Sequence, residues 1–268
     1  MAKLGSRREQ RRSNEIILIV LALLVVLVVV VGTAYFIMTR AEGLDKKTLC
    51  PAKGPIGHYV LLIDKTDPLT FTQNEAFAVM LRELVEKRIP EGYLLSVFSL
   101  GEDFKETAKP LAELCNPGSG KDKSELTSNK TQLKRQYQDR FIDPLLKQSA
   151  SLVGLQSAKQ SPIFEMLQMV GINAFRKHDV KGEKRLIVLS DMLHNTTQFS
   201  MYKGLVEYSE FTASPYGQKA QPDLHGVEVE INYLINTPQL QTKRNLKFWE
   251  DYFNKAGARI VAVRPMEG

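Results

Sequence analysis

Cysteine is scarce in this sequence. Among 268 residues only Cys50 and Cys115 carry a thiol, and neither belongs to a CxxC pair or to a Cys/His spacing. That absence excludes the common zinc motifs. Residues 118–121 read Gly-Ser-Gly-Lys, but the first glycine of a P-loop is missing and no predicted strand leads into them. Neither a zinc motif nor a phosphate-binding loop is therefore expected.

Charged side chains are absent from residues 16–38, which are almost entirely apolar. At about 1.5 Å of rise per residue, a helix of this length spans the roughly 30 Å of a membrane's hydrocarbon core. We therefore predict a transmembrane helix at residues 16–39. A cleaved signal peptide is the alternative, because residues 32–34 are small, although the apolar run resumes after them.

Basic residues are more numerous before this helix than after it. Those before it are Lys3, Arg7, Arg8, Arg11 and Arg12, and those after it are Arg40, Lys46 and Lys47. The positive-inside rule then places the basic tail, residues 1–15, in the cytoplasm and the rest of the chain in the periplasm or outside the cell. The helix would be the signal anchor of a single-pass membrane protein. Because the span holds no ionisable residue, a role in proton or sodium coupling is not favoured.

Opposite charges nearly balance beyond the membrane. The whole chain has a net charge of +6, but residues 1–40 hold six basic and two acidic residues, which leaves 30 basic and 28 acidic residues in the remainder. Nucleic-acid-binding domains normally show a strong basic excess. We therefore expect protein partners and a membrane, and no nucleic acid.

The length after the anchor, about 225 residues, is enough for one domain with its own core. We assign residues 40–56 to a linker and residues 57–268 to this domain. Cys50 and Cys115 both lie beyond the membrane, and an even pair in an exported chain most simply forms a disulfide.

Short apolar runs alternate with amphipathic segments through the domain. Such alternation is typical of parallel crossovers, so we predict a doubly wound α/β fold, with a mostly parallel sheet covered by helices on both faces. Residues 110–115 are expected to form a short edge strand. The other predicted strands cover residues 58–63, 93–100, 185–189, 227–235 and 259–263, and the predicted helices begin near residues 70, 131, 161 and 237.

Polar residues lie at the carboxyl ends of two predicted strands and in the loop before the third predicted helix, at the edge where sheets of this type bind ligands. Three separate segments contribute them: Asp64, Thr66 and Asp67 from the first, Ser161 from the second, and Ser190, Asp191 and His194 from the third. One alternative is purely structural, with the aspartates capping loops and Ser161 serving only as a helix N-cap.

The arrangement resembles the von Willebrand factor A-type domain over about residues 57–265. In that family a DxSxS motif, a threonine on a later loop and an aspartate after the fourth strand surround a divalent cation. The resemblance implies that Mg²⁺ or Ca²⁺ is the cofactor and that its ligands are Asp64, Thr66, Ser161 and Asp191, with Asp67 as an extra carboxylate. Pro68 stands where the second hydroxyl of the motif belongs, so the metal motif is degenerate.

The leading hypothesis for function is a membrane-anchored, exported interaction protein. Its A-type domain would dock a protein partner in an envelope or membrane complex, through Asp67, Ser190 and His194 beside the cation. No catalytic residue is assigned, and a non-enzymatic role is favoured. The alternative is a metal-dependent hydrolase of the phosphoesterase kind, in which three aspartates hold the ion and His194 assists.

Overall fold

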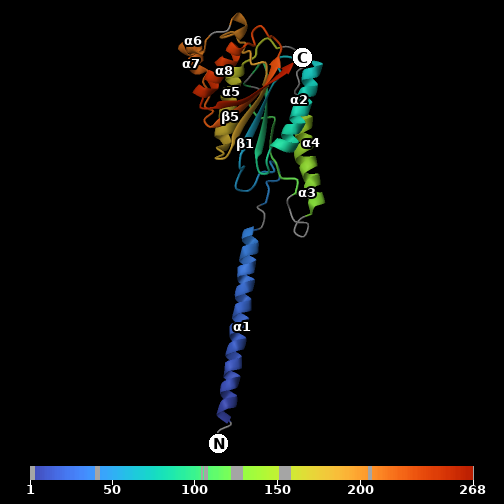
Figure 1. Cartoon of the computed structure of the whole chain (residues 1–268), viewed down its shortest axis with the longest axis vertical. Coiled ribbons are helices and arrows are strands. Elements are labelled where there is room, and N and C mark those ends of the chain that lie inside the picture. Colours follow the sequence, from blue (N-terminus) through green and yellow to red (C-terminus); the bar gives the residue numbers. More distant parts are fainter. Residues whose placement is uncertain are drawn as a thin grey trace. The chain divides into compact units, whose positions relative to one another are not determined.

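The computed structural model describes residues 4–39, 43–103, 105, 108–121, 129–150, 158–204 and 207–267. The chain divides into two compact units, with the boundary between Gly43 and Leu44. The first unit contains one helix, α1 (Leu4–Thr39), and the second is an α/β domain (Figure 1). Within α1, Ile17–Tyr35 has a mean hydropathy of 3.3 and is long and apolar enough to cross a membrane, as predicted. A signal sequence near the N-terminus has the same properties.

Six strands form one sheet in the order β3-β2-β1-β4-β5-β6. All neighbouring pairs are parallel except β2 with β3, which is antiparallel. The predicted mostly parallel sheet with one short edge strand is therefore confirmed. The strand bounds are β1 (His58–Asp64), β2 (Leu94–Leu100), β3 (Ala112–Cys115), β4 (Lys184–Ser190), β5 (Val227–Ile235) and β6 (Arg259–Glu267). Successive crossovers run in opposite directions on either side of β1, so the topological switch point lies between β1 and β4.

Helices cover both faces of the sheet, as Figure 1 shows. One layer contains α2 (Phe71–Glu83), α3 (Lys130–Tyr137) and α4 (Asp143–Ala150), and the other contains α5 (Ile163–Val170), α6 (Tyr208–Ala213), α7 (Pro215–Lys219) and α8 (Lys243–Lys255). Three π-helical segments continue these helices: η1 (Leu84–Arg88), η2 (Gln138–Ile142) and η3 (Gly171–Arg176). A single 3₁₀ turn, η4 (Met201–Lys203), lies between β4 and α6.

A separate hydrophobic core lies on each face of the sheet. In β1, Val60 and Leu62 contact the core of α5 and α8, whereas Leu61 and Ile63 contact the core of α2 and α4. Successive strand side chains point to opposite faces, so a strand covered on both sides must be apolar at nearly every position. This explains the uninterrupted apolar run from which β1 was predicted.

Helix beginnings follow the sequence signals in part. The helix predicted to begin near residue 70 does so, because Thr70 and Gln73 form a capping box at the start of α2. The last helix starts later than expected: the chain turns after Pro238, and α8 begins only at Lys243.

The segment before β1, predicted to be a linker, is part of the α/β unit. Leu49 is buried in the core of α2 and α4. The adjacent Cys50 forms the predicted disulfide with Cys115, the last residue of β3. Residues 44–56 therefore belong to the α/β unit, and Leu49 and Cys50 attach them to it.

Candidate functional site

Asp64 ends β1 and is the centre of a hydrogen-bond cluster at the carboxyl end of the sheet. Its Oδ1 accepts bonds from the backbone nitrogen and the hydroxyl of Thr66, at 2.9 and 2.6 Å. Its Oδ2 accepts bonds from the hydroxyls of Ser190, at 2.7 Å, and Ser161, at 3.5 Å. Because β1 and β4 are parallel neighbours, their carboxyl ends meet at the switch point. The structure thus brings these predicted residues together.

Asp191 lies in the turn that follows β4. Its carboxylate accepts bonds from the backbone nitrogen of Leu193, at 2.9 Å, and from the hydroxyl of Tyr202, at 3.3 Å. The next residue, Met192, has a φ of 56°, a left-handed conformation that costs energy for any residue with a Cβ. The indole of Trp249 in α8 donates a 2.8 Å bond to the carbonyl of Met192. The position of Asp191 therefore depends on a strained turn that α8 holds in place.

Ser161 reaches the cluster because it does not cap the helix that follows it. The N-cap of α5 is Pro162, and no side chain caps this helix. Ser161 instead forms a short antiparallel bridge with Asn195, with backbone hydrogen bonds of 2.7 and 3.0 Å. The alternative prediction that Ser161 is only an N-cap is wrong, and its hydroxyl donates to Asp64.

Among the residues that the structure describes, none of the basic side chains pairs with the three aspartates of the cluster. Asp64 and Asp191 are 6% and 3% exposed, and Asp67 is half-buried within hydrogen-bonding reach of Asp191. Burial raises the pKa of Asp64, and burial together with the charges of Asp64 and Asp67 raises the pKa of Asp191 well above its usual range. Within the described residues no ion pair joins these carboxylates to a lysine or arginine. The cluster therefore favours uptake of positive charge, as a proton or as a cation.

The donor set suits a hard cation. Carboxylate and hydroxyl oxygens are the ligands that Mg²⁺ and Ca²⁺ prefer. The side chains available to a cation are Asp64, Thr66, Ser161, Ser190 and Asp191. The part of the chain that the structure describes has no group of three or more His, Cys, Asp or Glu side chains placed to hold a metal ion. A cation here would rest on two carboxylates with hydroxyls, and it would keep positions open for water or a partner's oxygen.

His194 is a core residue. Its Nδ1 lies 3.4 Å from the backbone nitrogen of Phe164, and its Nε2 lies 3.0 Å from the hydroxyl of Tyr216 and 3.2 Å from that of Thr196. Burial lowers the pKa of His194 to about 3, so the ring is neutral at physiological pH. His194 and Ser190 were both expected to contact a partner, but neither side chain is exposed, because each is used in hydrogen bonds inside the domain.

A cleft of about 600 Å³ opens at the same end of the sheet. Its lining includes Lys65, which follows Asp64, and Pro162, which follows Ser161. Glu102, just beyond β2, lies on the same cleft. The cleft therefore adjoins the cluster and leaves room for a side chain of a binding partner.

Three residues that support the site were not predicted. Tyr202 donates to the Asp191 carboxylate, Trp249 fixes the turn after Asp191, and Gln241 donates a 3.0 Å bond to the Asp191 carbonyl. All three lie at least eleven residues from Asp191 in sequence, and only the fold brings them to it. The helical spacing of Trp249, Tyr252 and Phe253 is typical of a core face, but this spacing does not indicate what the Trp249 N–H contacts.

Solved structures that are similar to this chain share little sequence with it. Neither a protein-family model nor a curated protein sequence matches this chain. Among solved structures, an aerotolerance-related membrane protein from Bacteroides fragilis is similar, with 9% identity over 78% of this chain and 90% of that chain, at a TM-score of 0.36. The VWA domain of SpRpn10 is also similar, with 9% identity over 79% of this chain and 89% of that chain, at a TM-score of 0.36. The second is a von Willebrand factor A-type domain.

Proposed function

We propose that this chain is a membrane-tethered interaction protein that binds an acidic group of a protein partner through a divalent cation. The cation would be held at the rim formed by Asp64, Thr66, Asp67, Ser161 and Asp191, and the partner's acidic group would reach the cation there. The observation that carries the proposal is the convergence of two buried carboxylates and three hydroxyls from separate segments, without a basic partner among the described residues. If these side chains only capped loops and helices, one such segment could be expected by chance. The meeting of three such segments at one point is harder to explain in that way.

Burial, together with the charges of Asp64 and Asp67, raises the pKa of Asp191, and a bound cation would offset these charges. Asp64 and Asp191 would hold the ion, and the hydroxyls would complete part of its coordination. An incoming carboxylate from the partner would then meet a site that is no longer dominated by negative charge. Asp67, half-buried at the edge of the rim, is the side chain best placed to be near that group.

The proposed location is outside the cytoplasm. Five basic residues before the span, against three after it, support a cytoplasmic N-terminus. The Cys50–Cys115 disulfide also supports an oxidising compartment for the domain. The hydrolase alternative needed His194 beside the ion, and the buried, hydrogen-bonded position of this ring does not favour it.

The test uses Trp249, the only tryptophan of the chain, as a reporter. Because its indole bonds the turn after Asp191, cation binding should change its fluorescence. Mg²⁺, Ca²⁺ and Mn²⁺ would be titrated into the detergent-solubilised chain, with calorimetry in parallel. The double variant Asp64→Asn with Asp191→Asn should lose both signals, whereas Asp139→Asn, an exposed aspartate of η2, should keep them.

Partner binding is then measured by co-purification from solubilised membranes. The double variant should lose the partner that the native chain and Asp139→Asn retain, while its circular dichroism stays unchanged. If the native chain gives no cation signal at millimolar ion, the cation is dropped from the proposal. If the double variant keeps the partner, the rim is not the interface.

A further inference from the structure

The middle of β5 and β6 carries charged side chains on the face of the sheet that α2 covers. Val229 and Ile231 of β5 point into the opposite core, so the alternating Glu228 and Glu230 point to the α2 face. Arg264 of β6 lies on this face as well, because it contacts Glu230. The apolar core beneath α2 and α4 takes in only the ends of these strands, through Leu234 and Met266.

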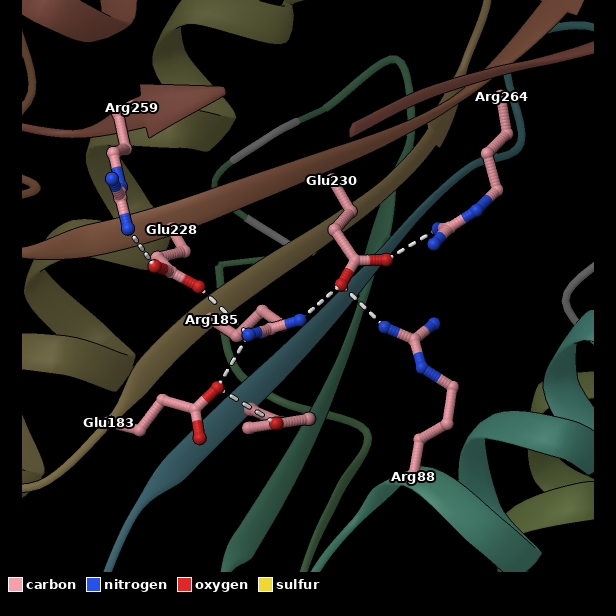
Figure 2. Close-up of polar contacts among 8 residues, drawn as sticks. Arg88, Glu183, Arg185, Glu228, Glu230, Arg259 and Arg264 are labelled. Atoms are coloured by element: carbon pink, nitrogen blue, oxygen red, sulfur yellow. Dashed lines mark hydrogen bonds and ion pairs between the residues drawn. The ribbon is translucent and has the colours of Figure 1, made fainter. Parts of the chain in front are cut away.

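Glu230 is the centre of an arginine cluster on this face. Its carboxylate is 1% exposed and pairs with Arg88 of η1, Arg185 of β4 and Arg264 of β6, as Figure 2 shows. Burial alone would raise the pKa of Glu230, but hydrogen bonds from Arg264 and Arg185 and the nearby Arg88 lower it to about 2. The ion pairs therefore hold these charged side chains in place on the α2 face of the sheet, and this cluster is called the floor. The Arg264 side chain remains 50% exposed on it.

A groove of about 560 Å³ lies between α2 and this floor. Ala76, Val79 and Met80 of α2 form its apolar wall, and Arg264 and Met266 of β6 contribute to its floor. Val79 is 67% exposed, so its apolar side chain is accessible from the groove.

The groove has the length of a short helix. Its lining residues on α2 run from Thr72 to Glu83 along one helix face, which at 1.5 Å per residue is about 16 Å, or three turns. The charges on its two sides are opposite. Glu75 and Glu83 belong to the α2 wall. On the strand side, Arg264 of β6 and the side chain of Arg88, which comes from η1, both pair with Glu230. This separation of acidic and basic side chains determines the charges expected on a bound helix, because the helix must offer basic residues to one side of the groove and acidic residues to the other.

We propose that this groove binds an amphipathic helix of a partner protein. Its apolar stripe packs on Val79, Met80 and Met266, a basic flank faces Glu75 and Glu83 on α2, and an acidic flank faces Arg264. Helix-in-groove recognition uses anchors on one face over two to three turns, which matches the length of this wall. The site is separate from the cation rim, since no rim residue lines the groove.

The probe is a phage-displayed library of 14-residue helical peptides with a leucine stripe and with flank positions varied among Glu, Lys and Ser. It is selected on the full chain in detergent, with counter-selection on Val79→Glu. The expected consensus carries Lys on one flank and Glu on the other. The best peptide should bind the native chain at least tenfold more tightly than the same peptide with its flanks exchanged.

Charge reversal on the wall tests the orientation. Glu75→Lys with Glu83→Lys should invert the preference between the two peptides, whereas Glu210→Lys, an exposed glutamate of α6, should leave it unchanged. Neither wall glutamate belongs to the Glu230 cluster, and circular dichroism of each variant checks that the fold is retained. The bound peptide should be helical by NMR.

Four results would overturn the proposal. The first is that no peptide is enriched over the Val79→Glu counter-selection, and the second is a consensus peptide whose two flanks do not carry opposite charges. The third is a bound peptide that is extended and paired to β6. The fourth is self-association of the native chain that Val79→Glu abolishes. The third would identify strand addition at the sheet edge, and the fourth would identify a second copy as the occupant.

Discussion

Trp249 and Met192 are joined by a 2.8 Å hydrogen bond from the indole N–H to the carbonyl oxygen, although 57 residues separate them. Met192 follows Asp191 directly and adopts a left-handed backbone, at a cost on the order of 1 kcal/mol. Trp249 itself is fully buried in the core of α5 and α8. Packing in this core thus fixes the turn that presents a carboxylate of the rim.

Replacing Trp249 with phenylalanine should therefore affect the rim as well as stability. The variant leaves the Met192 carbonyl without its donor and opens space in the core, so we expect the free energy of unfolding to fall by about 2 kcal/mol or more. Because the turn is released, affinity for the cation at the rim should fall as well. Urea denaturation and calorimetric titration with Mg²⁺ or Mn²⁺ measure the two effects.

Tyr252→Phe is the matched control, since Tyr252 lies on the same helix and its hydroxyl donates a buried 2.6 Å bond to the Ala220 carbonyl. Its loss should lower stability by about 1 kcal/mol and leave the cation affinity unchanged. Equal loss of affinity in both variants would show that general destabilisation, rather than the turn at Met192, controls the rim.

Most of the sheet was predictable from the sequence because both of its faces are covered. The strand at β1 needs apolar residues at nearly every position, and such runs are easily recognised. Asp64 and Asp191 were predicted to lie close together because they stand at the ends of two strands, and parallel topology places the carboxyl ends of adjacent strands together. Ser161 was predicted from the loop before the third helix, and its hydroxyl does reach Asp64.

The Glu230 cluster was not predictable in the same way. Glu228 and Glu230 alternate along β5 like the residues of a solvated strand face, which is the usual meaning of such spacing. Arg88 comes from a helix end 142 residues earlier, and no local pattern connects it to Glu230. Long-range charge pairing depends on which strands become neighbours, and the order of strands in the sheet cannot be predicted from the sequence of any single segment.

The Cys50–Cys115 disulfide should contribute substantially to stability. It spans 65 residues and joins the segment before β1 to the end of the edge strand β3. The chain-entropy account gives a stabilisation on the order of 4 kcal/mol for a loop of this length. Cys50→Ser with Cys115→Ser should therefore lower the melting temperature by roughly 10 °C. Calorimetry measures the shift, and alkylation of both thiols in the unreduced native protein would contradict the disulfide.

Stability should fall in acid through Glu230. Its pKa is about 2 in the folded domain against an ordinary 4.5, so the unfolded chain binds the proton more readily. The stabilisation, on the order of 3 kcal/mol, is complete above about pH 4.5 and is lost as the pH falls toward 2. Glu230→Gln should flatten this part of the curve of unfolding free energy against pH. Glu210→Gln, a change on the exposed surface of α6, should leave this part of the curve unchanged. Curves of the same shape for the native protein and both variants would exclude Glu230 as the cause of the acid sensitivity.

The orientation of the chain can be tested by altering the charges that are expected to set it. Replacing Arg11 and Arg12 with serine leaves three basic residues on each side of the span, so the native preference for one orientation should become a mixture. In the native chain, protease added to spheroplasts should digest the α/β domain completely, while a cytosolic marker stays intact. In the variant, a protected fraction should appear.

Complete protection of the native domain would contradict the proposed topology. Release of the domain from washed membranes in a shortened form would instead identify the apolar helix as a cleaved signal peptide.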